Sequence, residues 1–264
     1  MTGKDSLLIV VPTLDSFHLL PRLIESLYVQ IWRYWRVLFV DGPSGRQHRF
    51  WLENLVARDS RFSWFEQKSS FQGIFGAMNQ GFSQADNNEW VLFWGSDDWA
   101  AGPSVFSDLM SHIEGTSRLP DLLVCSGRYV GSSSQVLTRA SFFHPPGLLN
   151  ATEFRRMLFL GSTPPHQATL FGPGARQRLA NYDSSFRLSA DLDYFLQLSK
   201  SIGLKVQCVE LELVHMSDGG VSGKQTKRRL QEVRRAYRRA FGWGWWFTFM
   251  ARYIQRIFRL LIIS

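Results

Sequence analysis

The feature that most constrains the fold is a series of short apolar runs, each followed by a stretch of helical spacing. Residues 6–13 (SLLIVVPT) are almost wholly apolar, as expected of a strand buried on both faces of a parallel sheet. Apolar residues then recur at helical spacing over 17–31, and a second apolar run occupies 36–40. This alternation predicts an α/β fold in which a mixed, mostly parallel sheet is flanked by helices.

The same reasoning places the remaining elements, although the pattern becomes mixed beyond residue 100. We expect strands at 61–66, 90–94, 121–130, 136–143 and 204–214, with a turn at 131–134. We expect helices at 47–56, 74–85, 103–113, 151–160 and 190–202. With 264 residues, 45% of them hydrophobic, the chain suits one large domain with its own core.

Positive charge is concentrated at the C-terminal end. The chain carries 30 Lys and Arg against 22 Asp and Glu, a formal net charge of +8. Residues 224–264 hold eleven of the basic residues and one acid, Glu232, so their net charge of +10 leaves −2 for the rest. A protein that reads nucleic acid usually spreads cations over its folded face, so we expect no nucleic-acid partner. We predict a catalytic domain over 1–222 and a basic, amphipathic helical tail over 223–264.

Cysteine usage and the N-terminus both bear on location. Cys125 and Cys208 are the two cysteines, too few for a disulfide framework and not spaced as a zinc motif. The first apolar run begins without the long hydrophobic stretch or cleavage site of a signal peptide. Both features predict a cytoplasmic protein.

Three of the predicted strands end in polar or acidic residues. In an open parallel sheet the ligand lies outside the carboxyl ends of the strands, so these residues should share one site. They are Pro12, Thr13 and Asp15 after the first strand, Asp41 after the second, and Ser96, Asp97 and Asp98 after the strand at 90–94.

Asp97 and Asp98 are adjacent at the end of an apolar strand. Two carboxylates at close range disfavour joint ionisation, and a divalent cation would relieve the repulsion. Oxygen ligands favour Mg²⁺ or Mn²⁺, completed by water and phosphate oxygens. The alternative is that one Asp caps the helix at 103–113 and the other is solvated.

Asp191 lies in the first turn of the helix at 190–202, where the helix dipole favours a carboxylate. Such a group is placed to take a proton from a hydroxyl, and Asp193 is the alternative base. Taken alone, Asp191 is better explained as ordinary N-terminal helix charge, which is the alternative.

Taken together, these motifs resemble the family 2 glycosyltransferases of the GT-A fold. The resemblance rests on the order VVPTLD, FVDG, QGIFGAMNQG, WVLFWGSDD, HQATLF and SADLDYFLQL, and it covers about residues 7–222. It implies an inverting enzyme that moves a sugar from a nucleoside diphosphate, with UDP favoured, to a hydroxyl of a lipid-linked or saccharide acceptor. It also implies Mg²⁺ or Mn²⁺ as the cofactor.

The resemblance further implies a role for each matching residue. Pro12, Thr13 and Asp15 match the loop that holds the nucleotide base, and Asp41 matches the acid that hydrogen-bonds the base. Gly73, Ala77, Met78 and Asn79 match the segment that lines the nucleotide-sugar pocket. Ser96, Asp97 and Asp98 match the DXD motif, with Asp97 near the ribose and Asp98 on the metal. Asp191 matches the general base.

This division of labour suits direct displacement at an anomeric carbon. A metal on Asp98 would neutralise charge on the leaving diphosphate, and Asp191 would deprotonate the acceptor hydroxyl.

Two histidines are secondary candidates. His215, in HMSDGGVS, precedes a loop similar to one in the relatives that could close over the diphosphate or add a metal ligand; a structural or solvated role is the alternative. His166, before an expected short strand, could face the acceptor or serve packing.

One segment departs from the family pattern. Relatives often read Asp-x-Gly-Ile-Tyr-Asp-Ala-Met-Asn, whereas residues 71–79 read FQGIFGAMN. Both acids are absent, which indicates a donor sugar different from the commonest ones if those acids contact sugar hydroxyls.

Two rival functions remain. A nucleotidyltransferase acting on a sugar phosphate would also use a nucleotide fold and a metal, but residues 12–17 lack its Gly-rich, basic phosphate loop. A non-enzymatic module that binds membrane or nucleic acid through the tail would leave the acids at the strand ends unexplained.

The last segment has the spacing of an amphipathic helix. Arg252, Arg256 and Arg259 fall on one arc, and Phe247, Met250, Ile254, Ile257, Phe258 and Leu261 fall on the other. The longest uncharged run is too short to span a bilayer. We predict a helix that lies in the plane of the inner face of the cell membrane, with packing on the protein's own core or on a second subunit as the alternative.

Overall fold

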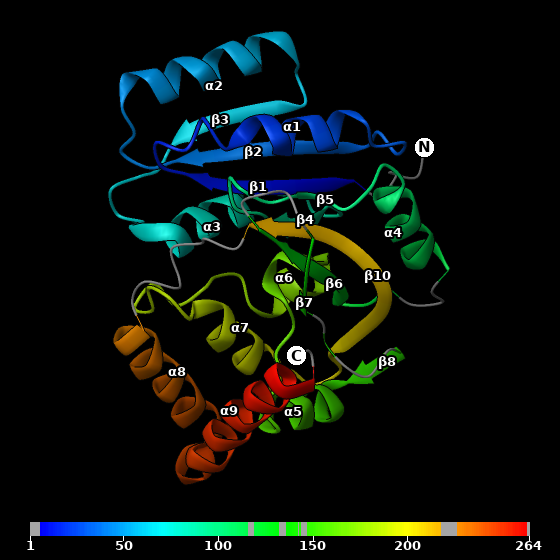
Figure 1. Cartoon of the computed structure of the whole chain (residues 1–264), viewed down its shortest axis with the longest axis vertical. Helices are drawn as coiled ribbons and strands as arrows, with labels where there is room; N and C mark the ends of the chain where they lie inside the picture. The colour runs from blue at the N-terminus through cyan, green and yellow to red at the C-terminus, as the bar shows by residue number, and fades with distance from the viewer. Residues whose placement is uncertain are drawn as a thin grey trace.

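A computed structural model describes residues 6–115, 119–131, 136–141, 143, 147–217 and 226–262, with the backbone alone for 136–140, 226 and 255–262. Its centre is a ten-stranded sheet of order β3-β2-β1-β4-β9-β6-β10-β5, with β7 paired to β6 and β8 to β10 (Figure 1). The strands are β1 (Leu7–Thr13), β2 (Trp35–Asp41), β3 (Phe62–Glu66), β4 (Trp90–Phe93), β5 (Trp99–Ala100), β6 (Leu122–Val130), β7 (Val136–Ser141), β8 (Gly147–Asn150), β9 (Thr169–Phe171) and β10 (Lys205–Ser217).

The first four strands of that order are parallel, and the second half of the sheet is mixed. β1 pairs in parallel with both β2 and β4, and β2 pairs in parallel with β3. β9 is antiparallel to β4 and β6, whereas β10 is parallel to β6. The mixed, mostly parallel sheet expected from the sequence is confirmed.

Helices cover both faces of the sheet. In Figure 1, α2 lies above the strands β1 to β3, α1 lies above β1, and α3 lies below β1. The helices are α1 (Leu20–Tyr28), α2 (Arg46–Arg58), α3 (Gly73–Ser83), α4 (Val105–Glu114), α5 (Ala151–Phe159), α6 (Pro173–Arg178), α7 (Ala190–Leu198), α8 (Thr226–Phe241) and α9 (Trp245–Ile262), with short 3-10 turns η1 (His166–Ala168) and η3 (Gly242–Gly244).

Two cores explain why the first apolar run contains no polar position before its end. Leu7, Ile9 and Val11 of β1 pack in one cluster with α1, α2 and α4. Leu8 and Val10 pack in the other, with α3, α5, α7 and α8. Because successive side chains of a strand point to opposite faces, a strand between two helical layers must be apolar at every position.

Most expected elements are present, with shifted ends. The strand expected at 204–214 reaches Ser217, and its ladder with β6 contains two register shifts. The sequence pattern missed the two-residue β5, the four-residue β8 and the short helix α6, because none is long enough to show a period. The turn expected at 131–134 lies largely outside the described residues.

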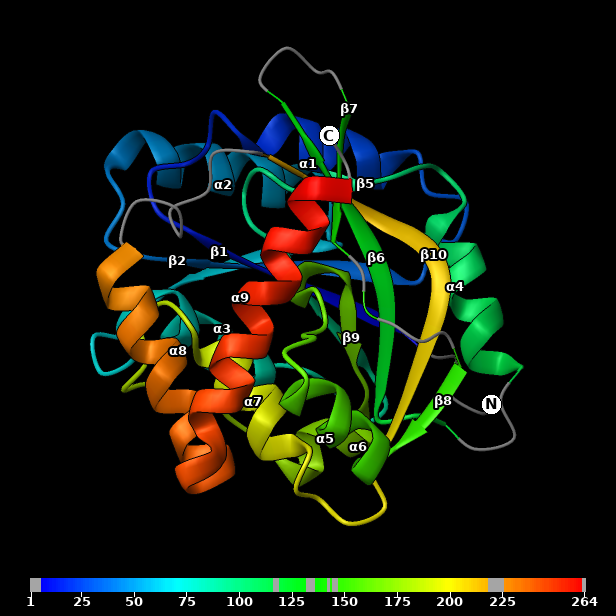
Figure 2. The ribbon, with the colours of Figure 1, turned by 60° about the horizontal axis from the view of Figure 1, so that its bottom comes forward.

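The C-terminal helices are built onto the body. Val233, Ala236, Tyr237 and Ala240 of α8 are buried in the same core cluster as α7. α9 follows as a second helix against α8, beside α5, at the end of the molecule opposite α1 and α2 (Figures 1 and 2). The boundary expected after residue 222 falls in 218–225, outside the described residues. In the part of the chain that is described, no helix is both long and apolar enough to cross a membrane.

Candidate active site

The carboxyl ends of the central strands meet at one edge, as the sequence predicts. Thr13, the last residue of β1, is in register with Asp41, the last residue of β2. The loops that follow β1 and β4 are joined by a hydrogen bond, because the hydroxyls of Ser16 and Ser96 are 2.7 Å apart. The residues expected to hold a nucleotide are therefore neighbours in the folded chain.

Asp41 is fully buried, and its two oxygens have different surroundings. Oδ1 accepts hydrogen bonds from the hydroxyls of Thr13 (2.9 Å) and Ser44 (2.6 Å), and Nε2 of His48 lies 3.0 Å from it. Oδ2 has no hydrogen-bond partner among the described residues, and its nearest cation is Nε of Arg49 at 3.6 Å. One oxygen thus fixes the carboxylate, and the other is left as a buried acceptor.

His48 supports Asp41 from α2. Its side chain is buried, and burial lowers its pKa while the charge of Asp41 opposes that shift. Nothing in the spacing of residues 46–58 distinguishes His48 from an exposed helix residue, so sequence reasoning missed it. Ser44 had a weak signal, because a hydroxyl three residues after an acid often hydrogen-bonds back to it.

Asp15 joins the loops after β1 and β2. Its Oδ1 accepts a hydrogen bond from the backbone N–H of Gly45 (2.7 Å), and its own N–H donates to Ser44 Oγ (2.9 Å). Its φ of +48° lies in the left-handed region, which Asp and Asn adopt more readily than other side chains. The conformation explains an Asx residue at this position. Pro12, immediately before Thr13, is half-buried, and its carbonyl lies 3.5 Å from Ser96 Oγ.

Asp97 and Asp98 converge beside Gly95 after β4. A Cβ added at Gly95 would lie 2.8 Å from Asp97 Oδ1 and 3.2 Å from Asp98 Oδ2. Asp98 is buried and accepts a hydrogen bond from the N–H of Gly95 (2.6 Å). Burial, and then the charge of Asp97, raises the pKa of Asp98 to about 8, and burial also raises the pKa of Asp97.

This pair fits a divalent cation as two oxygen ligands. A buried carboxylate with a raised pKa beside a second acid is a site that lacks positive charge. The described residues contain no group of three or more His, Cys, Asp or Glu side chains that could hold a metal. A cation at Asp98 would therefore need oxygens from water and diphosphate, which is how Mg²⁺ is commonly bound.

His215 lies near this pair but is engaged elsewhere. It is in register with Trp99, the neighbour of Asp98, and packs edge-to-face on the Trp99 ring with centroids 5.7 Å apart. Its Nε2 lies 2.9 Å from Glu212 Oε1. Among the described side chains it does not join Asp98 in a metal-binding group. The loop expected to close over the diphosphate falls mainly in 218–225, which lies outside them.

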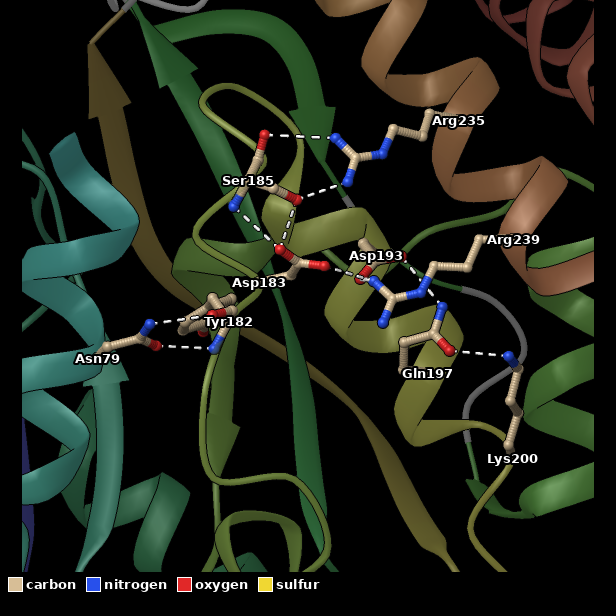
Figure 3. Close-up of polar contacts among 9 residues, drawn as sticks. All are labelled: Asn79, Tyr182, Asp183, Ser185, Asp193, Gln197, Lys200, Arg235 and Arg239. Atoms are coloured by element: carbon tan, nitrogen blue, oxygen red, sulfur yellow. Dashed lines mark hydrogen bonds and ion pairs between the residues drawn. The ribbon is translucent and has the colours of Figure 1, made fainter. Parts of the chain in front are cut away.

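The α3 segment, expected to line the nucleotide-sugar pocket, is tied to the loop before α7. Asn79 is buried, and both ends of its amide are used by the backbone of Tyr182: Nδ2 donates to Tyr182 O (2.9 Å), and Tyr182 N donates to Oδ1 (2.7 Å) (Figure 3). Met78 is buried in the hydrophobic core. Gly73 begins α3 with φ +75°, near Arg187. The polar atoms of Asn79 therefore hold that loop, and the place of this segment in the lining of the pocket stays a prediction.

His166 and Tyr182 lie between the end of β4 and α7. His166 stacks on Phe93, and its Nε2 is 2.8 Å from the Tyr182 hydroxyl. Burial lowers the pKa of His166 to about 4, and the charge of Asp191 opposes that shift, so Asp191 lies close by. A neutral ring enclosed by aromatic side chains favours the packing role.

Asp191 and Asp193 have different surroundings although they are two residues apart. Asp191 is half-buried, with no hydrogen bond or ion pair to a described residue. Asp193 is buried: Arg239 of α8 donates to its Oδ2 (3.0 Å), and Gln197 donates to its Oδ1 (3.0 Å) (Figure 3). Burial raises the pKa of Asp193, against the hydrogen bond from Gln197 and the charge of Arg239. Its contacts are those of a structural acid, which leaves Asp191 as the base candidate.

Glu232 of α8 organises the backbone that leads to Asp191. It is buried, and its carboxylate accepts hydrogen bonds from the backbone N–H groups of Arg187, Leu188 (2.7 Å) and Ser189 (3.0 Å). Ser189 immediately precedes α7. Sequence reasoning missed this role, although a single acid within a basic stretch was a signal.

Solved structures share this architecture. Residues 1–349 of TarS from S. aureus superimpose with a TM-score of 0.67 at 14% identity, covering 95% of this chain and 72% of that chain. A mannosyltransferase from Pyrobaculum calidifontis, solved with GDP-Man and Mn²⁺, gives a TM-score of 0.61 at 12% identity, covering 90% and 65%. The chain spans only 40% of a longer TarS structure. At these identities the likeness establishes the fold alone, which is that of GT-A glycosyltransferases.

Relatives found by sequence similarity are named as glycosyltransferases, the activity that the motifs predict. A PGL/p-HBAD biosynthesis glycosyltransferase of Mycobacterium bovis is 24% identical over 215 residues, which are 81% of this chain and 78% of the relative. A glycosyltransferase of Mycobacterium tuberculosis is 24% identical over 247 residues, which are 90% and 87%. Residues 8–172 match the model of glycosyl transferase family 2. The chain is an enzyme of glycosyl transferase family 2.

Proposed function

We propose that the protein transfers a sugar from a uridine diphosphate sugar to an acceptor hydroxyl by metal-assisted displacement with inversion. The observation that carries the proposal is the set of acids at one sheet edge, in which Asp41 ends β2 and Asp97 and Asp98 follow β4, the two strands that flank β1. A nucleotidyltransferase or a binding module would not account for a half-buried Asp191 whose side chain has no hydrogen-bond or ion-pair partner among the described residues.

The base half of the site is Asp41 with its supports. Uracil presents a single N–H between two carbonyls, and Asp41 presents a single buried oxygen without a hydrogen-bond partner among the described residues. A hydrogen bond there would satisfy a buried acceptor that otherwise costs free energy. Structures of TarS have been solved with UDP and with UDP-GlcNAc, which agrees with this preference.

The diphosphate half is Asp97 and Asp98. Mg²⁺ or Mn²⁺ bound there supplies positive charge for the leaving diphosphate. Asp98 would hold the cation, Asp97 would face the ribose side, and the missing ligands would be oxygens of the donor and water. His215 would then act through its packing on Trp99.

The acceptor half is Asp191. Its carboxylate would take the proton of the acceptor hydroxyl as that oxygen bonds to the anomeric carbon. The bond from that carbon to the diphosphate oxygen breaks at the same time, and the nucleoside diphosphate leaves with the electron pair. One displacement of this kind inverts the anomeric configuration.

We further propose that the acceptor is lipid-linked and that the enzyme works at the inner face of the cell membrane. A relative is named for the biosynthesis of PGL/p-HBAD, and the tail has a net charge of +10 whereas the rest of the chain has −2.

A thermal-shift panel of UDP, TDP and GDP sugars with Mn²⁺ tests the donor. A ligand at one hundred times its Kd stabilises the native state by about 2.7 kcal/mol, or roughly 5–10 °C for a chain of this size. We expect that shift with a uridine sugar and none with a GDP sugar. Equal shifts for both would refute the uridine preference, and no shift with any donor would refute the function.

A further inference from the structure

The last helix, with the turn before it, leaves large apolar side chains exposed. On its inner side Thr248 is fully buried, Arg252 is half-buried, and Trp245 and Phe249 pack against the core. Five other large apolar side chains of η3 and α9 are exposed, and we call them the outer stripe: Trp243 (88% exposed), Trp246 (52%), Phe247 (48%), which also stacks on Phe159, Met250 (53%) and Ile254 (46%). A helix on a water-soluble surface normally exposes polar side chains instead.

Contacts on the inner side fix this orientation. Arg252 donates hydrogen bonds from Nη1 to the Thr163 hydroxyl and to the Tyr237 hydroxyl (3.1 Å). Gly161 has φ +90°, and a Cβ on it would lie 2.6 Å from both the Cα and the N of Arg252. Because the backbones of Gly161 and Arg252 are so close, α9 cannot rotate about its axis to bury the outer stripe without losing these contacts.

The exposed charges of α8 that have no ion-pair partner among the described residues are cationic, and α8 is the helix that packs against α9. On α8, Arg228, Arg235 and Arg239 are used internally, on Glu232, Ser185 and Asp183 with Asp193 (Figure 3 draws the last two arginines). Lys227 and Arg238 are exposed, and neither forms an ion pair with a described residue. Arg234 lies over the ring of Trp245, 4.8 Å from its centroid.

We propose that the outer stripe is a docking surface for an anionic lipid bilayer, on which α9 lies in the plane of the membrane. Exposed Trp beside aliphatic side chains and free cations is the composition that binds such interfaces. A second copy of the chain is a poorer occupant, because two segments of net charge +10 would face one another.

The role of the outer stripe rests on the proposed function, because the stripe would bring the enzyme to a lipid-linked acceptor. Thr163, which Arg252 holds, is three residues before His166. The docked helix is therefore hydrogen-bonded to the segment that leads to His166.

Co-sedimentation of the full chain with lipid vesicles tests the proposal. Neutral vesicles contain phosphatidylcholine alone, and anionic vesicles contain phosphatidylcholine with about 30% phosphatidylglycerol. The test variant carries Trp243→Ser, Trp246→Ser and Met250→Ser, and the matched control carries Ile31→Ser, Phe50→Ser and Ile202→Ser, three comparably exposed apolar residues elsewhere (66%, 64% and 94%). Melting temperatures check that both variants fold.

We expect binding to anionic vesicles that is at least about tenfold tighter than to neutral ones, because each cation near an anionic surface adds attraction. The test variant should lose about tenfold or more, and the control should bind within about twofold of the wild type. Three results would overturn the proposal. They are absence of binding to the vesicles, equal binding by the test variant and the wild type, and a dimer that forms in the wild type and the control but not in the test variant. UDP binding measured without vesicles reports on the proposed function separately.

Discussion

Replacing Asp98 with asparagine should stabilise the metal-free protein while removing metal-dependent donor binding. Asp98 is buried beside Asp97, and its pKa is raised from an ordinary value of 3.8 to about 8. The folded state therefore holds a proton that the unfolded state releases between these two pH values. Stability falls as pH rises through that window. At about 1.36 kcal/mol per pKa unit, the difference between the folded and unfolded pKa of Asp98 lowers the free energy of unfolding at pH 7 by about 4 kcal/mol, compared with acid pH.

Asparagine has the same shape, can still accept the hydrogen bond from Gly95 N–H, and carries no charge. We expect Asp98→Asn to raise the melting temperature at pH 7 in EDTA by roughly 8–16 °C, since 1 kcal/mol is worth about 2–4 °C in a chain of this size. The gain should shrink to less than about half at pH 5, which is closer to the ordinary pKa at which the unfolded carboxyl also becomes protonated.

Differential scanning fluorimetry at pH 5, 6, 7 and 8 measures this directly. Glu53→Gln, an exposed carboxyl on α2, is the control and should change the melting temperature little at any of these pH values. An Asp98→Asn protein that melts below the wild type at pH 7 in EDTA, or whose gain does not grow with pH, would refute the reasoning.

Three further substitutions separate the other acids. Asp191→Asn should retain UDP binding and lose transfer by at least about a hundredfold, whereas Asp193→Asn should retain transfer, because the carboxylate of Asp193 is occupied by Arg239 and Gln197; a reversal in the transfer assay would exchange their roles. Glu232→Gln should reduce kcat with little change in the KM for donor, because it weakens the hydrogen bonds that hold the chain before Asp191; an unchanged kcat would refute that positioning role. Asp41→Asn should weaken UDP binding by about tenfold or more, since the buried acceptor is altered; calorimetry showing the wild-type Kd would contradict base recognition there.

The order and type of the main elements could be read from the sequence because the two cores impose it. β1 lies between helices on both faces, so its side chains are apolar at successive positions, and this run predicts a strand buried on both faces. The same reasoning brought Thr13, Asp41 and Asp98 to one edge, since the carboxyl ends of parallel strands coincide.

Contacts between residues far apart in the chain could not be predicted in this way. Asn79 meets Tyr182 across 103 positions, and Arg239 meets Asp193 across 46. Neither pair leaves a local pattern, so neither contact could be predicted from the sequence. The tail posed the same difficulty: periodicity separated its polar and apolar sides, but the contacts of Arg252 with Thr163 and Tyr237 decide which side faces the body.

The central claim is that a uridine nucleotide and a divalent cation bind together at Asp98. Calorimetric titration of UDP into the full chain, in Mn²⁺ and then in EDTA, tests it most directly. We predict clear binding in Mn²⁺, binding at least about tenfold weaker in EDTA, and no difference between the two conditions in Asp98→Asn. Equal UDP affinity of the wild type in Mn²⁺ and in EDTA would contradict the account.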